Sequence, residues 1–467
     1  MSSALTKYLH AAGHDVRLFT PLYSSIKRDR FPMHPVDGMQ NMDIAVGPHR
    51  YVMSVLTTRM PGSSASIYLI DCPALYSRAT LYTEDADEHL RFLAFTRAAF
   101  ACCQRMQWSP EILHCNDWHT AFAPLMLRTG YREEPLLAPA RTLLTIHNIG
   151  YQGIFPATAV ADLDLGAAAP ALLDAADLAA GRINALRHGI RYAGAVSTVS
   201  PTHAREIATE PYGMGLAAEV RARGEAVSGI LNGVDYAQWD PRHDPFLPEH
   251  YDPEHLAGKA RLKAALQRRL GLASEPAVPL LGMVTRLAAQ KGIELLYEAL
   301  PRVLGARALA CVVLGSGEAQ YERFLRGLAG EFPGRVHFTS GYDEALAHWI
   351  EAGSDLFLMP SRYEPCGLNQ MYSLRYGTVP VVRRTGGLAD SVEHFDAASG
   401  RGTGIVFNDF DAPALEWALN TALDLYATPH AWAQLRRNGM ARDFSWTRQA
   451  GAYVALYRQL LAAAGAH

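Results

Sequence analysis

The chain has no long hydrophobic run and no excess of charge of either sign. Of its 467 residues, 43 are Lys or Arg and 46 are Asp or Glu, which gives a formal net charge of -3. With neither a basic stripe nor an acidic tail, the composition argues against nucleic acid or an anionic membrane as the main partner. The longest apolar runs, such as 308–314, have the length of a β-strand and are too short to span a bilayer.

Cysteine is also sparse. There are six, namely Cys72, Cys102, Cys103, Cys115, Cys311 and Cys366. No pair has C-x-x-C spacing, and no signal-peptide pattern precedes them, so reduced thiols are a simpler interpretation than disulfides or a zinc site. His114, His119 and His147 also match no common metal-ligand spacing. These absences predict a soluble, cytoplasmic protein that needs no metal and no other cofactor.

What the sequence does contain is a repeated alternation of short strand-like segments with helical patterns. In the first half, strands are expected at 15–20, 66–70, 111–114, 142–146 and 195–199, and helices at 87–106 and 175–193. In the second half, strands are expected at 280–285, 310–314, 336–339, 355–359 and 379–382. Such alternation indicates βαβ units and parallel sheets.

Two domains are the natural division of a chain of this length. A Pro/His/Asp-rich stretch, 239–253, follows Asn232-Gly-Val-Asp235 and is interpreted as a linker or hinge. We therefore expect an α/β protein of two doubly wound, Rossmann-like domains facing each other across a cleft, with ligands at the carboxyl ends of the strands. The predicted division is 1–234, 235–445 and a last helix, 446–467.

The string SRYEPCGLNQMYSLRYGTVPVVRRTGGLAD, residues 361–390, is the most informative stretch. Glu364 lies on a loop between an apolar strand and a helix, where a carboxylate can bind sugar hydroxyls or offset positive charge at an anomeric carbon. A lone Glu there is more often a helix-start residue. Thr385, Gly386 and Gly387 follow the next strand and open a helix, so their N–H groups can hold a phosphate.

Arg286 and Lys291 follow the strand at 280–285 and could neutralise a diphosphate that departs from a sugar. Two solvated surface charges are the usual alternative. Gly315, in the turn Gly-Ser-Gly after the strand at 310–314, is a weak signal that a tight turn alone would explain.

In the first half, His147 follows the strand at 142–146 and can hydrogen-bond a sugar hydroxyl, although a structural histidine is the commoner case. Asp117 could bind an acceptor hydroxyl, and Trp118 has a flat apolar surface on which a sugar ring could stack. A Trp that packs in the core is equally compatible with the pattern.

These strings resemble the bacterial glycogen synthase and plant starch synthase family: R-L-x-x-Q-K-G at Arg286, H-N-x-x-Y-Q-G at His147, D-W-H at Asp117 and the whole of 361–390. The resemblance implies a GT-B fold and a retaining glucosyltransferase that transfers glucose from ADP-glucose to α-1,4-glucan (glycogen). It implies catalytic roles for Glu364, Arg286, Lys291 and His147. It implies donor-binding roles for Gly315, Cys366, Gly367, Leu368, Tyr372, Thr385, Gly386 and Gly387, and acceptor-side roles for Asp117, Trp118, His119, Tyr151 and Gln152.

Tyr372 stands where the wider group of retaining transferases has a second Glu, as is usual for the glycogen synthase branch, so only one carboxylate carries over. The start of the chain, by contrast, departs from the family's pattern. The family begins with a strand and a K-x-G-G-L loop that grips the donor's phosphates, whereas residues 2–16 already look like the following helix and strand, and Lys7 is no substitute. The first domain is therefore expected to be truncated, with a misplaced start favoured over a weakly active short form.

Two alternatives remain open. One is a related transferase that uses another nucleotide-glucose donor. The other is a catalytically weak or silent glucan-binding paralogue, which the absent loop suggests. The sequence does not indicate an oligomeric state.

Overall fold

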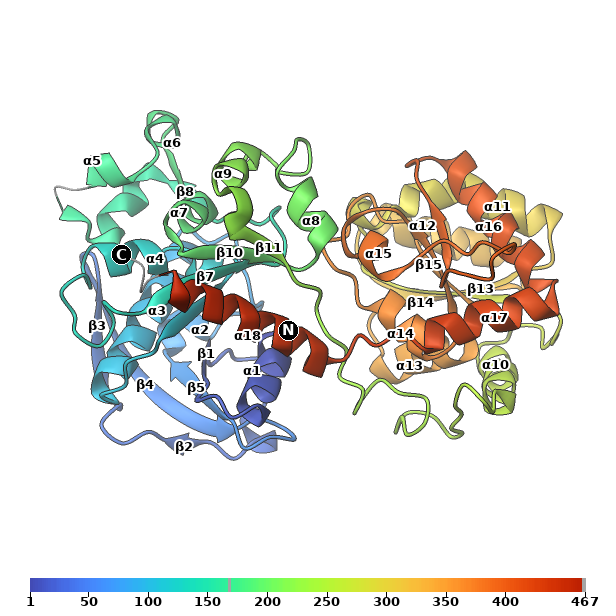
Figure 1. Ribbon diagram of the computed structural model, residues 1–467, viewed down its shortest axis with the longest axis horizontal. Coiled ribbons are helices and arrows are strands. Elements are labelled where there is room, and N and C mark those ends of the chain that lie inside the picture. Colours follow the sequence, from blue (N-terminus) through green and yellow to red (C-terminus); the bar gives the residue numbers. More distant parts are fainter. Residues whose placement is uncertain (167–168, 464–467) are drawn as a thin grey trace. The chain divides into compact units, whose positions relative to one another are not determined.

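The computed structural model describes residues 1–166 and 169–463, and the chain divides into two compact units (Figure 1). Unit 1 comprises Met1–Val199, Ala204–Ile230 and the chain from Gln449 onward, and unit 2 comprises Ser200–His203 and Leu231–Arg448. The main boundary therefore lies at Ile230/Leu231, a few residues before the predicted 234/235. The last boundary lies at Arg448/Gln449 rather than at 445/446.

The larger strands of unit 1 fall into two separate sheets. The first is five-stranded, in the order β1-β5-β4-β2 with β3 also paired to β4; its strands are β1 (Arg17–Pro21), β2 (His34–Pro35), β3 (Met42–Val46), β4 (His49–Arg59) and β5 (Ser66–Asp71). The second is four-stranded and parallel, in the order β11-β10-β7-β6; its strands are β6 (Ile112–Asn116), β7 (Arg141–Ile146), β10 (Ala195–Thr198) and β11 (Val227–Gly229). The sequence predicts one parallel sheet here, so the division is a finding of the structure.

The helices of unit 1 cover these sheets. They are α1 (Ser2–Ala11), α2 (Pro73–Tyr76), α3 (Glu88–Arg105), α4 (Ala123–Arg128), α5 (Ala169–Leu172), α6 (Ala175–Ala179), α7 (Ala185–Tyr192), α8 (Pro201–Glu206), α9 (Ala217–Ala222) and α18 (Trp446–Ala462). Both α8 and α18 straddle a boundary between the units. The part of α18 beyond Gln449 belongs to unit 1, where the hydroxyl of Tyr457 lies 2.7 Å from Nδ1 of His114 on β6.

Two expectations for unit 1 were wrong. The eleven-residue β4 runs antiparallel to both β3 and β5, so the first sheet is mixed rather than parallel. The helix expected over 175–193 is interrupted by β9 (Arg182–Asn184), which pairs antiparallel with β8 (Ile154–Pro156). Gly181, with a φ of 73°, ends the first helical piece, and the side chain of Asn184 accepts from the backbone N–H of Arg187 to begin the second.

Unit 2 is built on one continuous six-stranded parallel sheet, in the order β14-β13-β12-β15-β16-β17. Its strands are β12 (Leu280–Val284), β13 (Ala310–Gly315), β14 (Val336–Ser340), β15 (Leu356–Met359), β16 (Val379–Arg383) and β17 (Ile405–Phe407). Its helices are α10 (Ala257–Arg269), α11 (Leu296–Ala306), α12 (Ala319–Glu331), α13 (Glu344–Gly353), α14 (Asn369–Arg375), α15 (Gly386–Ser391), α16 (Ala412–Tyr426) and α17 (Pro429–Met440). The five strands predicted for this half are all present, and the short β17 is the one that sequence reasoning missed.

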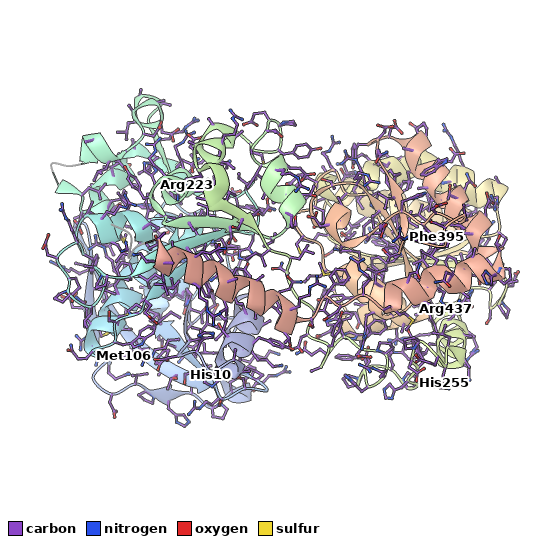
Figure 2. The ribbon with its side chains drawn as sticks, in the orientation of Figure 1. His10, Met106, Arg223, His255, Phe395 and Arg437 are labelled. Carbon is purple, nitrogen blue, oxygen red and sulfur yellow. The ribbon has the colours of Figure 1, made fainter. Side chains whose placement is uncertain are left out.

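The side-chain view separates the core of unit 2 from its surface. Phe395 lies among other side chains in the interior, whereas Arg437 and His255 lie on the outside (Figure 2). The inner strands β12, β13, β15 and β16 are almost wholly buried, as expected for a parallel sheet covered on both faces.

The stretch 239–253, expected as a linker or hinge, is instead anchored inside unit 2. The Trp239 ring stacks on His348 at 3.6 Å and on Tyr372 at 3.9 Å, measured between ring centroids. Asp244 is fully buried, and one of its carboxylate oxygens bonds Nδ1 of His348 and the hydroxyl of Tyr376. A composition shift suggested a linker, but these aromatic and acidic side chains are the contacts that fix the segment.

All six cysteines are buried and unpaired. Burial raises the pKa of every thiol, to about 12 for Cys115, Cys311 and Cys366. Separately, no helix within residues 1–166 and 169–463 combines the length and apolar character needed to cross a membrane.

Candidate active site

In unit 2, the predicted cation and carboxylate meet. The Nζ of Lys291 lies 2.6 Å from Oε2 of Glu364, and the hydroxyl of Ser361 donates to the same oxygen at 3.0 Å. Lys291 follows β12 and Glu364 follows β15, two strands that are paired in the sheet. Glu364 is buried, with 5% of its surface exposed, so its carboxylate is held by these partners.

The backbone around Lys291 fits closely against the loop that carries Glu364. Gly292 has a φ of 69°, and a Cβ built on it would lie 2.1 Å from the carbonyl oxygen of Pro360. Only glycine tolerates both the left-handed conformation and this approach. The N–H of Arg362 donates to the carbonyl of Gln290 at 2.9 Å, which ties the two loops together.

Arg286 stands apart from this pair. Its guanidinium is exposed and makes a long contact of 3.4 Å with Oε1 of Gln290. Its loop is held by the turn that starts at Gly315, since a Cβ there would lie 2.0 Å from the carbonyl oxygen of Thr285. Gly315 therefore has a packing role that places Arg286 at the carboxyl end of β12.

In the Thr385-Gly386-Gly387 loop, where the sequence suggests amides for a phosphate, two neighbouring backbone amides are bonded within the protein. The N–H of Gly387 donates to the carbonyls of Glu364 at 3.0 Å and Pro365 at 3.2 Å, and the N–H of Leu388 donates to Thr385. A Cβ on Gly386 would lie 1.9 Å from the carbonyl oxygen of Glu364. The two glycines thus let this loop pack closely against the Glu364 segment, with the Gly387 amide bonded to that segment.

The remaining predicted donor-side residues support the same loop. The Sγ of Cys366 accepts from the N–H of Asn232 at 3.4 Å, and Gly367 has a φ of 69°. Leu368 precedes α14 as a half-buried residue. Tyr372, on α14, has its ring stacked flat on Trp239, and burial raises its pKa.

One exposed aromatic residue in this region was missed. Tyr342, just beyond β14, has 80% of its surface exposed, and the N–H of the preceding Gly341 donates to the carbonyl of Gly315. A large aromatic side chain left in solvent at the carboxyl end of a parallel strand suits the stacking of a flat ring. The pattern Gly-Tyr directly after a predicted strand was the available signal.

In unit 1, His147 and Asp117 are joined by backbone and side-chain contacts. Oδ1 of Asp117 accepts from the N–H of His147 at 2.7 Å, and Asp117 has the unusual φ of 52° for a residue other than glycine. Burial raises the pKa of Asp117 to about 6. Nε2 of His147 lies 2.9 Å from Oδ1 of Asn116 and donates to it, which leaves Nδ1 as an acceptor.

Two histidines of this group in unit 1, His147 and His119, are neutral at physiological pH. Burial lowers the pKa of His147 to about 4, with the positive chain terminus as a second cause, and lowers that of His119 to about 3. Within the described part of the chain, Nε2 of His119 is buried without a hydrogen-bond partner. A sugar hydroxyl is a group that could satisfy it.

Of the other predicted acceptor-side residues, two make contacts within the protein and one is exposed. Trp118 is packed by Phe92, Phe155 and Gly153, where a Cβ would lie 2.5 Å from the indole. Gln152 uses its side-chain amide within the protein, donating to Met214 and accepting from Asn184. Tyr151, with 57% of its surface exposed, is the aromatic residue here that remains open to a ligand.

Comparisons with known proteins agree with this picture. Residues 1–222 match the family described as the starch synthase catalytic domain, and residues 270–438 match glycosyl transferases group 1. A glycogen synthase of Anaeromyxobacter dehalogenans is 45% identical over 470 residues, covering 98% of this chain and 95% of that protein. A glycogen synthase of Koribacter versatilis is 42% identical over 467 residues, covering 98% and 93%.

Solved structures give the same result for the fold. The catalytic domain of starch synthase IV from Arabidopsis thaliana, bound to ADP and acarbose, has a TM-score of 0.90 at 33% identity, covering 99% of this chain and 95% of that one. A sucrose-phosphate synthase from Thermosynechococcus elongatus, at 20% identity and a TM-score of 0.60, covers 98% and 92%. The predicted α/β fold of GT-B type is confirmed, and the chain belongs to the glycogen synthase and starch synthase family of glycosyltransferases.

Proposed function

We propose that this member of the family transfers glucose from ADP-glucose to the 4-hydroxyl of an α-1,4-glucan, with retention of configuration. The observation that supports it most is the Lys291–Glu364 pair, 2.6 Å apart at the carboxyl ends of two neighbouring parallel strands. The related starch synthase IV was solved with ADP and acarbose, a nucleoside diphosphate and a glucan-like oligosaccharide.

The charges suit the transfer of a glucosyl group. As the donor breaks, negative charge grows on the departing diphosphate and positive charge on the anomeric carbon. Lys291 and the exposed Arg286 can take the diphosphate, while the Glu364 carboxylate binds glucose hydroxyls and offsets the positive centre. The ion pair holds the two side chains in place before the donor arrives.

The neutral imidazole of His147 supplies a second contact to glucose. With Nε2–H given to Asn116, its Nδ1 can accept from a sugar hydroxyl, a role that a protonated ring could not fill. Asp117 fixes the backbone of His147 and can accept from an acceptor hydroxyl with its remaining lone pairs. No metal ion or other cofactor enters this scheme, since the diphosphate meets Arg and Lys.

Transfer of radiolabelled glucose to glycogen tests the proposal, with ADP-glucose and UDP-glucose compared as donors. Lys291→Gln and Glu364→Gln should each lower kcat by about 10²–10³-fold, the range for removal of a preorganised charged contact. Arg302→Gln and Glu298→Gln are the matched controls, because they break an exposed ion pair on α11 of unit 2. Glycogen binding without turnover would instead favour a silent paralogue, and a preference for UDP-glucose would favour the other donor.

Tyr342 is proposed to stack on the base of the donor nucleotide. Stacking of a base on an aromatic side chain is worth about 1–3 kcal/mol, so Tyr342→Ala should raise KM for the donor by roughly tenfold and leave kcat nearly unchanged. Tyr297→Ala, a partly exposed tyrosine on α11, serves as the control. An unchanged KM for Tyr342→Ala would remove this residue from the site.

A further inference from the structure

Trp417 is the most exposed of the seven tryptophans in the chain. Half of its surface is open to solvent, whereas the other six are buried or half-buried. It lies on α16 of unit 2 (Figure 1), a helix that packs into the core through Leu415, Leu419 and Leu423. Residues two apart are separated by about 200° around a helix, so Trp417 points away from that core. This large apolar ring therefore lies outside the packing that holds its own helix.

The ring of His394 lies beside that of Trp417. Their centroids are 5.8 Å apart and their planes differ by 25°, so the two rings are nearly parallel. Nδ1 of His394 accepts from the backbone N–H of Val406, on β17, at 3.1 Å. A neutral imidazole that accepts at Nδ1 carries its proton at Nε2, and burial together with Arg384 lowers the pKa of His394, which favours this neutral form. Nε2–H is thus a fixed donor, and within residues 1–166 and 169–463 it has no hydrogen-bond partner.

A cation and a carboxylate flank the two rings. Arg384 and Asp396 both influence His394, the first lowering its pKa and the second raising it. Arg384 is exposed and bonds Oδ1 of Asn408 through Nε at 2.8 Å, which leaves its terminal N–H groups to solvent. Asp396 is exposed as well, and one of its carboxylate oxygens accepts from the hydroxyl of Ser399. Because the two charges offset each other, this surface suits a neutral ligand with hydroxyl groups better than a polyanion.

These features together match the chemistry of a sugar. A pyranose ring has an apolar face of C–H groups, which stacks on a flat aromatic ring, and a rim of hydroxyls, which need donors and acceptors. A lone exposed aromatic residue needs no such explanation. Here the exposed indole lies next to a second ring with a fixed N–H donor, a guanidinium and a carboxylate. Groups of such complementary kinds at one place on the surface indicate a binding site.

We propose that Trp417, His394, Arg384 and Asp396 form a second glucan-binding site, here named the Trp417 patch. Trp417 stacks on the apolar face of one glucose residue of an α-1,4-glucan, and Nε2–H of His394 donates to a hydroxyl of the chain. Arg384 and Asp396 bind further hydroxyls, the first as a donor and the second as an acceptor. The choice of an α-1,4-glucan rests on the function proposed above, because this is the polymer that the proposed reaction extends.

The Trp417 patch differs from the proposed transfer site in what it contributes. It shares no residue with the Lys291–Glu364 pair, so it holds the polymer and leaves the chemical step unchanged. Glycogen presents many chains, and binding one of them at the patch raises the effective concentration of the others at the transfer site. A trisaccharide that occupies one site at a time gains nothing in this way. The patch should therefore lower KM for glycogen without altering kcat, and leave KM for maltotriose unaffected.

Electrophoresis of the full chain in gels that contain glycogen tests the proposal. Trp417→Ala should need roughly tenfold more glycogen than the wild type for the same retardation, because loss of one of two linked sites removes the gain from linkage. Trp417→Phe, which keeps a smaller ring, should lie between them. Tyr297→Ala removes another partly exposed aromatic ring of unit 2, on α11, and should be retarded like the wild type. Because these side chains are partly exposed, all four proteins should have nearly the same Tm.

Two further measurements separate the Trp417 patch from the transfer site. Trp417→Ala should show a roughly tenfold higher KM for glycogen, with kcat and the KM for maltotriose nearly unchanged. Titration with maltoheptaose should change the tryptophan fluorescence of the wild type and of Glu364→Gln, and Trp417→Phe should lack this change. Fluorescence and retardation need no turnover, so a chain that binds glycogen through Trp417 and transfers no glucose would contradict only the proposed function.

Three results would overturn the proposal. The first is equal retardation of Trp417→Ala and the wild type by glycogen, which would leave the proposed transfer standing. The second is a change in Trp417 fluorescence with ADP but not with maltoheptaose, which would make the ligand a nucleotide. The third is a lower mass in sedimentation for Trp417→Ala than for the wild type, which would make the patch an interface between two copies of the chain.

Discussion

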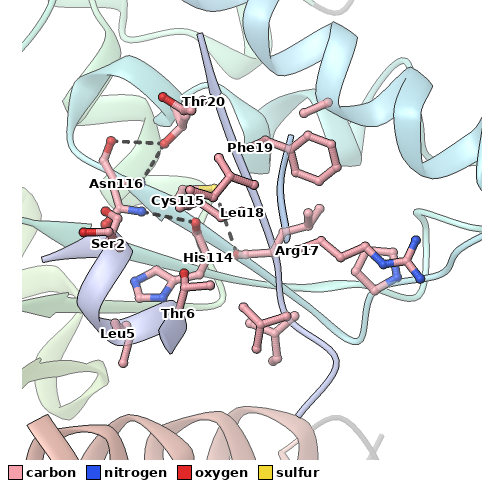
Figure 3. A pocket seen from close by; sticks show the side chains of 18 of the residues that line it. Ser2, Leu5, Thr6, Arg17, Leu18, Phe19, Thr20, His114, Cys115 and Asn116 are labelled. Atoms are coloured by element: carbon pink, nitrogen blue, oxygen red, sulfur yellow. Dashed lines mark hydrogen bonds between the residues drawn. The ribbon is translucent and has the colours of Figure 1, made fainter. Parts of the chain in front are cut away.

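Both units contain parallel strands with apolar residues, but these strands are buried to different extents. In unit 2, β12 and β13 lie inside a continuous six-stranded sheet and are almost wholly buried. In unit 1, β1 and β6 also carry apolar residues, such as Leu18 and Ile112, but within the described part of the chain each pairs with one strand only, and most of their side chains are half-buried around a cavity (Figure 3). Apolar sequence alone therefore does not bury a strand; a neighbour on each side is also required.

Among these predictions, the largest effect is expected where Gly387 packs against the Glu364 segment of unit 2. Gly387→Ala would place a Cβ 2.1 Å from the carbonyl oxygen of Cys366, so the Glu364 segment must move. We expect a loss of about 2–4 kcal/mol in stability and at least a hundredfold loss of activity, because a displacement of about 1 Å at a reacting group has that effect. Urea unfolding and the glycogen assay measure the two losses.

Gly327→Ala is the control for that substitution. It lies within α12, where nothing approaches the new Cβ within 4 Å. Alanine should stabilise this helix by about 0.5–1 kcal/mol. If Gly387→Ala were as well tolerated as Gly327→Ala, close packing would not be what positions Glu364.

The comparison of the sheets can be tested with one substitution in both units. Leu281→Ala removes a fully buried side chain from β12 and should cost about 2–5 kcal/mol. Leu18→Ala, in the half-buried β1, should cost about 1 kcal/mol, because much of that side chain already meets the cavity. Denaturant unfolding with a probe in each unit gives both values, and equal losses would show that β1 is as well covered as β12.

Lowering the pH should decrease the folding stability of unit 1, because its buried histidines are neutral in the folded state. Burial lowers the pKa of His114 and His119 to about 3 and that of His147 to about 4. On unfolding each recovers its ordinary pKa of about 6.5, so the unfolded chain binds more protons between about pH 4 and pH 6.5. Stability is therefore complete above about pH 6.5 and falls as the pH decreases, by up to about 1.4 kcal/mol per pH unit for each histidine.

Asp117 acts in the opposite direction over part of this range. Its pKa, raised to about 6 by burial, means that the folded state binds the extra proton between about pH 4 and pH 6. Three histidines outweigh one carboxyl, so Tm should still drop from pH 7 to pH 5. His114→Gln should reduce that drop, whereas the exposed His255→Gln in unit 2 should not; an equal drop in all three proteins would contradict this account.

Much of unit 2 was predictable because its strands are short, apolar and flanked by helices in regular alternation. The meeting of Lys291 and Glu364 was implied by loops that follow neighbouring strands, and the structure brings the two side chains together. The partners of the Gly387 amide were not predictable, since they lie on a loop some twenty residues away in sequence and become neighbours only through the sheet.

Errors in unit 1 have local causes. The alternation in β4 suits an antiparallel strand, but strand direction depends on partners that the sequence does not specify. The break in the helix expected over 175–193 depends on Gly181 and on the side chain of Asn184, each a weak signal by itself. Trp239 was assigned to a linker by its neighbours' composition, although its own ring is what anchors the segment.

The rate at which the six buried thiols are alkylated reports how often each unit opens. Four lie in unit 1 and two, Cys311 and Cys366, in unit 2. A thiol with a pKa near 12 has almost no thiolate at neutral pH, so an alkylating reagent modifies it only after local opening. Mass spectrometry of alkylated peptides over time would therefore record how often each unit opens, and Cys103 and Cys115, which both line the cavity, should be modified earliest.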